Sequence, residues 1–123
     1  MTTIHVWTIQ MGKWRVAKEK DIHLLDTTAK SGIYAFAPDF GVVMAYKAGQ
    51  VSEVQYTDIY YARMRKSYRE NRDKWDMLKE YPRLAVACYC KPGVFCHRHL
   101  FVDIIGKIFE ADKVTMVLEG ELT

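Results

Sequence analysis

The chain has 123 residues; half are hydrophobic, 27% are charged, only 3 are proline, and the formal net charge is +3. A chain of this length buries one core and is short for two domains, and the composition is too apolar for a disordered protein. No apolar run approaches the roughly 18 residues of a membrane-spanning helix, and the N-terminus lacks the features of a signal peptide. We therefore expect one cytoplasmic domain over residues 1–123, without a membrane partner.

The first half of the chain predicts two strands and a short helix. Residues 4–9 alternate apolar and polar side chains with β-branched types, and residues 22–25 are a short apolar run, so both predict strands. The basic segment 12–20 between them predicts a loop or a short helix. A turn-forming Ala-Pro-Asp sequence then precedes an apolar-periodic segment, which predicts a short helix over residues 40–48.

The second half alternates helices with strands. Apolar and aromatic residues recur three and four positions apart and predict a helix over residues 53–70. A second helical segment ends at Pro82, because proline disfavours helical geometry in the residue before it. Uncharged residues 84–90 predict a buried strand, residues 96–109 a helix and residues 114–118 a last strand. Strands separated by helical crossovers predict an α/β fold, a three-layer Rossmann-like sandwich with a mainly parallel sheet.

Polar residues that follow the predicted strands are the first candidates for a ligand site, because ligands bind beyond the carboxyl ends of parallel strands. Residues 26–32, residues 88–98 and the short tail 119–123 meet this condition. The segment 88–98 is the most informative, since it joins reactive side chains to the start of a helix. A helix N-terminus favours an anion or a thiolate through its unpaired N–H groups and its partial positive charge.

Cys96 is expected at the N-cap of this helix, with Arg98 within one turn as a partner for phosphate or carboxylate. One interpretation is an oxyanion-binding cradle with a nucleophilic thiolate, in which Arg98 faces the surface and contributes little to stability. The other is that a cysteine caps a helix and Arg98 pairs with a nearby acid. We assign ligand binding to Lys30, Ser31, Cys90 and Arg98.

Metal binding is the rival interpretation of the same segment. Five potential metal ligands lie within twelve residues, at Cys88, Cys90, Cys96, His97 and His99. The spacing is not that of a typical zinc motif, because the first two cysteines are separated by one residue and the two histidines cannot share a helix face. We expect free thiols, no metal and no cofactor, with Cys96 the most reactive thiol and Cys88 either reactive or a small core residue.

A run of basic residues between positions 63 and 74 carries six positive charges against two acids. Such a run favours a polyanion, although most charge runs are solvated helix faces whose stems cover apolar surface. Tyrosines on the same predicted helix could stack bases, but at helical spacing they are more often core and rim. They are Tyr56, Tyr60, Tyr61 and Tyr68. The nucleic-acid candidates are Arg63, Arg65, Lys66 and Arg69.

The motif LAVACYCKPGVFCHRHLFVDII resembles the hallmark of the bacterial and phage family called domain of unknown function 488: an apolar strand ending in cysteine, a loop, and Cys-His-Arg opening a helix. LLDTTAKSG, FAPD and YTDIYYARMRKSY resemble its other segments, so the resemblance covers about residues 20–110. Family members commonly have glutamate where this chain has Cys90, which favours a third thiol or a metal ligand here. The resemblance implies a fold and a site without an established reaction, and marks Asp26, Cys88, Cys96, His97 and Arg98.

Two functional hypotheses follow. The first is a small enzyme acting on a phosphate-bearing small molecule, most simply a nucleotide, or on a nucleic acid. In it Asp26 is an acid, base or orienting group, Arg98 the anion clamp, Cys96 or Cys88 the thiolate and His97 the proton carrier. The second is a non-catalytic module, in the host cytoplasm if a phage encodes it, that binds nucleic acid or a host protein, with or without a structural zinc. Convergence of Asp26, Cys88 and Arg98 in one pocket would favour the first hypothesis, whereas scattering of these residues together with an exposed basic helix would favour the second.

Overall fold

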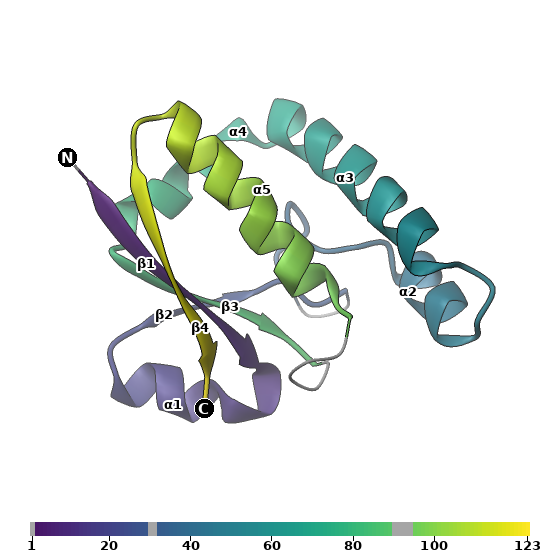
Figure 1. Cartoon of the computed structure of the whole chain (residues 1–123), viewed down its shortest axis with the longest axis horizontal. Coiled ribbons are helices and arrows are strands. Elements are labelled where there is room, and N and C mark those ends of the chain that lie inside the picture. Colours follow the sequence, from purple (N-terminus) through teal and green to yellow (C-terminus); the bar gives the residue numbers. More distant parts are fainter. Residues whose placement is uncertain (1, 30–31, 90–94) are drawn as a thin grey trace.

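A four-stranded, all-parallel sheet forms the middle layer of the protein (Figure 1). The structure, a computed structural model, describes residues 2–29, 32–89 and 95–123. The strand order is β2-β3-β1-β4, and the strands are β1 (Thr3–Gln10), β2 (His23–Asp26), β3 (Arg83–Cys88) and β4 (Thr115–Leu122).

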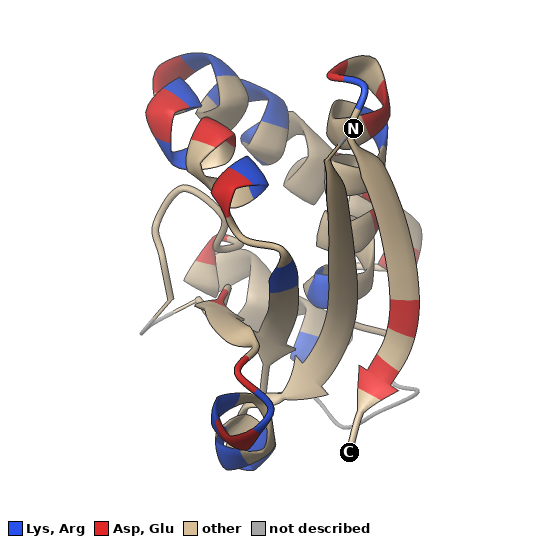
Figure 2. Cartoon of the chain, turned by 90° about the vertical axis from the view of Figure 1, so that its left-hand side faces the viewer, with Lys and Arg blue, Asp and Glu red and all other residues tan. Residues whose placement is uncertain are grey.

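Helices cover both faces of this sheet. The short helix α1 (Trp14–Glu19), which follows a 3₁₀ turn at Met11–Lys13, lies on one face. The opposite side carries α2 (Phe40–Lys47), α3 (Glu53–Glu70), α4 (Arg72–Met77) with a 3₁₀ turn at Leu78–Glu80, and α5 (His97–Ala111). The three layers and the parallel sheet confirm the predicted Rossmann-like α/β fold. Figure 2 shows that Lys, Arg, Asp and Glu lie mainly on the helices, with acidic positions in the second half of β4.

The pleat of the strands divides the core into two parts. Ile4 and Val6 of β1 pack with β3, α3 and α5 on the larger side, whereas Ile9 packs with Ala17 of α1 on the smaller side. β3 is buried along residues 84–88, as expected for a strand covered on both faces. The run of uncharged residues that predicted this strand is therefore explained by the position of β3 between β2 and β1.

Local signals explain most of the helix boundaries. Ser52 and Gln55 form a capping box, in which each side chain binds the other residue's backbone N–H, and α3 begins directly after it. The Asp39 side chain accepts a hydrogen bond from the Val42 N–H at the start of α2. The predicted helices over residues 40–48, 53–70 and 96–109 are confirmed to within two residues at each end.

The prediction that residues 119–123 form a tail after the last strand is wrong, because β4 continues to Leu122. Val6 of β1 pairs with Leu118 of β4, but the next residue of β1, Trp7, pairs with Gly120. Glu119 is therefore an extra residue in a β-bulge. Gly120 has a φ of 99°, a conformation that glycine adopts without strain. The bulge lets the ladder continue past the point where the apolar pattern ends.

The loop between β2 and α2 is tied to the helical layer by buried hydrogen bonds. The Ser67 hydroxyl of α3 donates to the Ala35 carbonyl and accepts from the indole N–H of Trp75, 3.1 Å away. The Phe36 ring packs edge-on against Trp75, with 4.9 Å between centroids.

Among the described residues, no helix has the length and apolar character needed to cross a bilayer.

Candidate functional site

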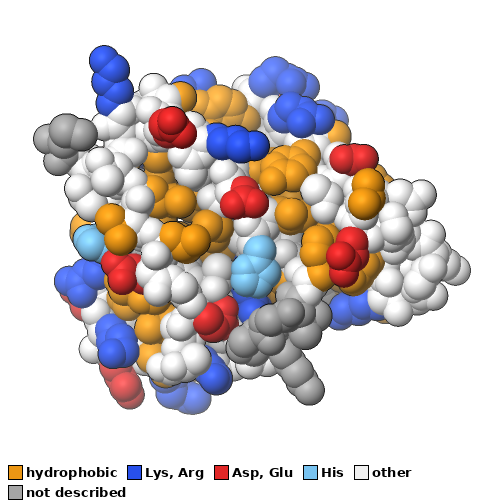
Figure 3. Space-filling model, in the orientation of Figure 1, with side chains coloured by type: hydrophobic (Ala, Val, Ile, Leu, Met, Phe, Trp, Pro, Cys, Tyr) orange, Lys and Arg blue, Asp and Glu red, His pale blue; other side chains and the backbone are white. Residues whose placement is uncertain are grey.

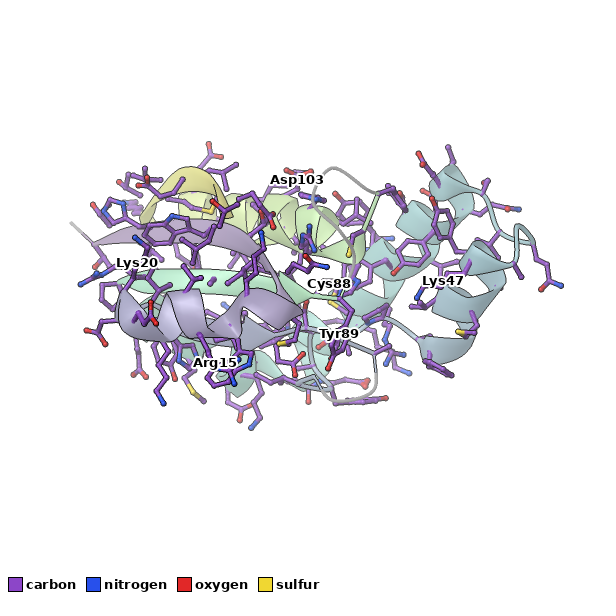
Figure 4. The ribbon with its side chains drawn as sticks, turned by 90° about the horizontal axis from the view of Figure 1, so that it is seen from below. Arg15, Lys20, Lys47, Cys88, Tyr89 and Asp103 are labelled. Atoms are coloured by element: carbon purple, nitrogen blue, oxygen red, sulfur yellow. The ribbon has the colours of Figure 1, made fainter. Side chains whose placement is uncertain are left out.

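Two cysteines and a histidine meet where β3 ends and α5 begins. Cys88 is the last residue of β3, Cys96 is the N-cap of α5 and His97 is its first residue. All three are buried, each with 4% of its surface exposed. Their thiol sulfurs and one ring nitrogen lie within 4.8 Å of one another. Figure 4 shows Cys88 in the middle of the molecule, between the sheet and the helix that carries Lys47. We call these three residues the thiol–histidine cluster.

The orientation of the His97 ring is set by Thr27, which follows β2. Nε2 of His97 lies 2.6 Å from the Thr27 carbonyl oxygen and 3.1 Å from its hydroxyl oxygen. A carbonyl oxygen only accepts hydrogen bonds, so in the neutral ring Nε2 carries the proton and Nδ1 carries the lone pair. Thr27 is itself fully buried, and its hydroxyl donates to the Ala87 carbonyl over 2.9 Å. Two neighbouring strands therefore hold the ring in place.

Nδ1 of His97 faces both thiols of the cluster. It lies 3.6 Å from Sγ of Cys96 and 3.8 Å from Sγ of Cys88. A nitrogen lone pair at this distance can accept a proton from a thiol, which is the arrangement that activates cysteine nucleophiles. The predicted roles of cysteine as thiolate and of His97 as proton carrier thus have a geometry that permits them.

The cluster lines a cavity of about 260 Å³ whose other walls are mainly aromatic and aliphatic. The Phe95 ring lies 5.3 Å from Tyr46 of α2 and 5.5 Å from Tyr56 of α3, measured between centroids. Lys47 also lines the cavity and is exposed. This volume is slightly below the roughly 300–1,000 Å³ of typical ligand pockets and suits a single ring or one part of a larger ligand. We call this space the aromatic cavity.

Tyr60 supports the cluster from α3. Its ring centroid lies 5.7 Å from that of His97, and its buried hydroxyl donates to the Phe36 carbonyl over 2.8 Å. Burial raises the pKa of Tyr60 well above its ordinary value of 10.0, and the nearby Tyr56 and Cys96 raise it further. Tyr60 is therefore a neutral hydrogen-bond donor at physiological pH.

Asp26 lies beside the aromatic cavity but is not among the residues that line it. Its Oδ1 accepts hydrogen bonds from the Thr28 N–H at 2.9 Å and from the Thr28 hydroxyl at 2.7 Å, and Thr28 does line the cavity. A Cβ on Gly32 would clash with the backbone N and O of Thr28, so only glycine fits there. Asp26 thus shapes the loop that forms one wall.

Arg98 does not face the surface, so the premise that made its loss look harmless to the fold is wrong. Its side chain is fully buried, and Nη2 lies 3.5 Å from Oε1 of Glu121 in β4. Successive helical residues point about 100° apart, and Arg98 is absent from the residues that line the aromatic cavity with His97. Pairing with an acid, the second sequence interpretation, is what the structure shows. Anion binding by Arg98 stays a prediction, and the anion would compete with Glu121.

The structure brings together only part of the predicted site. Convergence of Asp26, Cys88 and Arg98 would favour an enzyme, but of these three residues only Cys88 lines the aromatic cavity. Cys96 and His97 line the cavity together with Cys88. Thr27 was not singled out from the sequence, where its only signal is its position directly after a strand. Lys30, Ser31 and Cys90 lie outside the described residues.

The predicted nucleic-acid residues of α3 divide into two groups. Arg65, Lys66 and Arg69 are exposed, and Figure 3 shows basic side chains gathered over the C-terminal half of α3. Arg63 is half-buried; its Nε donates to the Ala37 carbonyl over 2.8 Å and its guanidinium lies over the ring of Tyr34. Arg63 therefore also holds the loop before α2.

The thiol–histidine cluster has the donor set of a thiophilic metal ion. Two thiolates and one imidazole are ligands that zinc prefers, and a backbone carbonyl on the other ring nitrogen, as Thr27 provides, is the usual support of a metal-bound histidine. The exposed His99 is not part of this set.

A parallel α/β sandwich with a buried thiol–imidazole cluster at the carboxyl ends of its strands defines a Rossmann-like protein with a potential reactive centre. Residues 6–108 match the family model DUF488-N3a, described as the active DUF488-N3 subclade. The chain therefore belongs to the DUF488 family, which confirms the resemblance seen in the Cys-His-Arg motif. No curated protein and no solved structure matches the chain.

Proposed function

We propose that this protein is an enzyme that uses a cysteine thiolate, generated by His97, on a nucleotide or a nucleic acid. The observation that carries the proposal is the fixed ring of His97. Its Nε2 is bound to Thr27 at 2.6 Å while its Nδ1 lies 3.6 Å and 3.8 Å from two thiols. This arrangement leaves a base of defined orientation next to a nucleophile.

Cys96 is the better candidate for the nucleophile. Its sulfur is the closer of the two to Nδ1, and it lies at the N-cap of a 15-residue helix without making a side-chain capping bond. The partial positive charge of the helix N-terminus stabilises a thiolate at that position. Cys88 lies at the end of a central strand and acts as a neighbour that can share the proton of the cluster.

The chemical step begins with transfer of the Sγ proton of Cys96 to Nδ1 of His97, which gives a thiolate and an imidazolium. The thiolate electron pair then forms a bond to an electrophilic atom of the substrate, and the bond to the leaving group breaks with its electrons on that group. The imidazolium returns its proton to the leaving group, so charge and protons balance.

The aromatic cavity and the surrounding charge support a nucleotide or nucleic-acid substrate. Aromatic walls such as Tyr46 and Phe95 suit a planar ring. The exposed Lys47 on the same cavity can meet a phosphate, and the chain carries a net positive charge. In this scheme Asp26 positions Thr28 at the cavity wall.

Timed alkylation with iodoacetamide at pH 7, followed by peptide mapping, tests the proposal. Cys96 is expected to react faster than a free peptide thiol and faster than Cys88. The variant His97→Gln cannot take up a proton and is expected to slow the reaction of Cys96 roughly tenfold or more. His99→Gln, which changes the exposed neighbouring histidine, is the matched control and should react as the wild type.

Three outcomes would overturn the proposal. Modification of Cys96 that is slower than that of a peptide thiol, or equally fast in His97→Gln, would overturn the assignment of Cys96 as an accessible nucleophile activated by His97. Stoichiometric zinc in the native mass spectrum, with thiols that react only after chelation, would make the cluster a metal site instead.

A further inference from the structure

The surface between α3 and α5 contains a basic groove of about 360 Å³. Its cations are Arg65 and Arg69 from α3 and Lys107 from α5, all exposed, and apolar residues such as Met64 and Ile104 form its floor. Basic side chains are prominent over this part of the surface in Figure 3. We call it the α3–α5 groove. It is separate from the aromatic cavity, with which it shares no lining residue.

The charges of the groove are arranged to receive an anion. None of the described residues that line it is acidic. Arg65 and Arg69 are four residues apart on one helix, and like charges at that spacing destabilise a helix. A bound anion between them would relieve this repulsion. By contrast Arg72 is already paired, with its Nε 3.1 Å from Oδ1 of Asp76, and does not line the groove.

An aromatic ring lies beside these cations. Tyr61 of α3 lines the groove and is half-buried, and Nζ of Lys107 lies 5.9 Å from its ring centroid. Burial raises the pKa of Tyr61, and the carboxylate of Asp103 raises it further, so the phenol is neutral at physiological pH. Alternation of cations with an accessible aromatic ring is the pattern by which proteins bind single strands: phosphates meet the cations and a base stacks on the ring.

We propose that the α3–α5 groove binds single-stranded nucleic acid, with phosphates on Arg65, Arg69 and Lys107 and a base on Tyr61. The inference rests on the proposed function in that it names a polymer as the substrate of the thiol–histidine cluster. α3 itself connects the two places, because Tyr56 of the same helix lines the aromatic cavity. At 1.5 Å per residue, Arg65 lies about 13 Å along the helix axis from Tyr56.

The test measures binding of short deoxyribo- and ribo-oligonucleotides by fluorescence anisotropy at several salt concentrations. The variant R65E/R69E/K107E reverses the cations of the groove. Its matched control, R15E/K18E/K20E, makes the same change of net charge with exposed cations at α1, on the opposite face of the sheet. Circular dichroism and thermal melting establish that both variants are folded.

For the groove variant we expect at least a tenfold loss of affinity at low salt. The slope of log K against log salt should become shallower by about 2, because about 0.7 counterions are released per phosphate contact on single strands. The control variant should keep the wild-type slope. Equal losses of affinity in the two variants would show that only net charge matters and would overturn the proposal. So would a wild-type protein that binds neither the deoxyribo- nor the ribo-oligonucleotide.

Substitution of Tyr61 separates single strands from duplexes. Tyr61→Ala is expected to weaken single-strand binding about fivefold or more, whereas Tyr61→Phe, which keeps the stacking face, should bind as the wild type. An equal effect of Tyr61→Ala on duplex binding, or tighter binding of the duplex by the wild type, would overturn the single-strand assignment. These variants leave Cys96 and His97 unchanged, so groove binding can fail while thiol activation holds, and the reverse.

Discussion

Replacement of Arg98 by alanine is expected to destabilise the protein severely, contrary to the behaviour of a surface arginine. Arg98 is fully buried and is among the largest side chains of the interior. Its guanidinium lies 3.5 Å from the carboxylate of Glu121, which also accepts a hydrogen bond from the Thr8 hydroxyl. Alanine would remove the cation and leave the carboxylate without its charged partner.

The size of the effect follows from this burial. Removal of one partner of a buried ion pair costs about 3–5 kcal/mol, because the other charge stays away from water. The Glu121 side chain keeps 21% of its surface exposed, and Thr8 still donates to it, so we place the loss at the lower end, about 3 kcal/mol. That is a large part of the roughly 5–15 kcal/mol that stabilises a typical domain.

Urea unfolding, followed by tryptophan fluorescence, to which the buried Trp75 contributes, measures this loss. The double variant R98M/E121Q removes both charges together. Its loss in free energy of unfolding should therefore be smaller, by about 1 kcal/mol or more, than the summed losses of the two single variants. A free energy of unfolding for Arg98→Ala within about 0.5 kcal/mol of the wild type, the range of surface substitutions, would refute the argument. So would strictly additive effects in the double variant.

Two further substitutions test the helical layer around the site. Ser67→Ala leaves the indole N–H of Trp75 and the carbonyl of Ala35 without a shared partner, and should cost about 2 kcal/mol in urea unfolding; a loss under about 0.5 kcal/mol would contradict this. Tyr60→Phe removes the hydrogen bond to Phe36 and should cost about 1 kcal/mol at pH 8. Because the pKa of Tyr60 is raised in the fold, its contribution is present below pH 10 and is lost as the pH rises above it, by up to about 1.4 kcal/mol per pH unit. The difference in free energy of unfolding between the wild type and the Phe variant should therefore shrink between pH 10 and 11. A constant difference would contradict the burial argument.

The order and type of the elements could be predicted from the sequence because their signals are local. The capping box of Ser52 and Gln55 and the spacing of apolar residues predict the start and length of α3 without reference to any distant segment. The uncharged run before Cys88 and the Cys96-His97-Arg98 motif likewise predicted a strand that leads into a helix. These features, and the parallel sheet that follows from them, also carry the family resemblance.

The composition of the site depended on contacts between segments far apart in the chain. Thr27 and His97 are separated by 70 positions and Arg98 and Glu121 by 23, and no periodicity within either segment indicates the partner. The partner of Arg98 was further hidden by the bulge at Glu119, which carries β4 beyond the end of its apolar pattern.

The sequence by itself determined that this is an α/β protein with its candidate site residues at the junction of a strand and a helix. The periods of strands and helices and their end signals depend on neighbouring residues, so they can be recognised without the fold. Only the tertiary structure decided which face each residue of that junction presents. Adjacent helical residues diverge by about 100°, so His97 turns toward the thiols and the aromatic cavity while Arg98 enters the core against β4. The packing of α5 on the sheet determines this arrangement, which places His97 at the cavity and Arg98 in the interior beside Glu121.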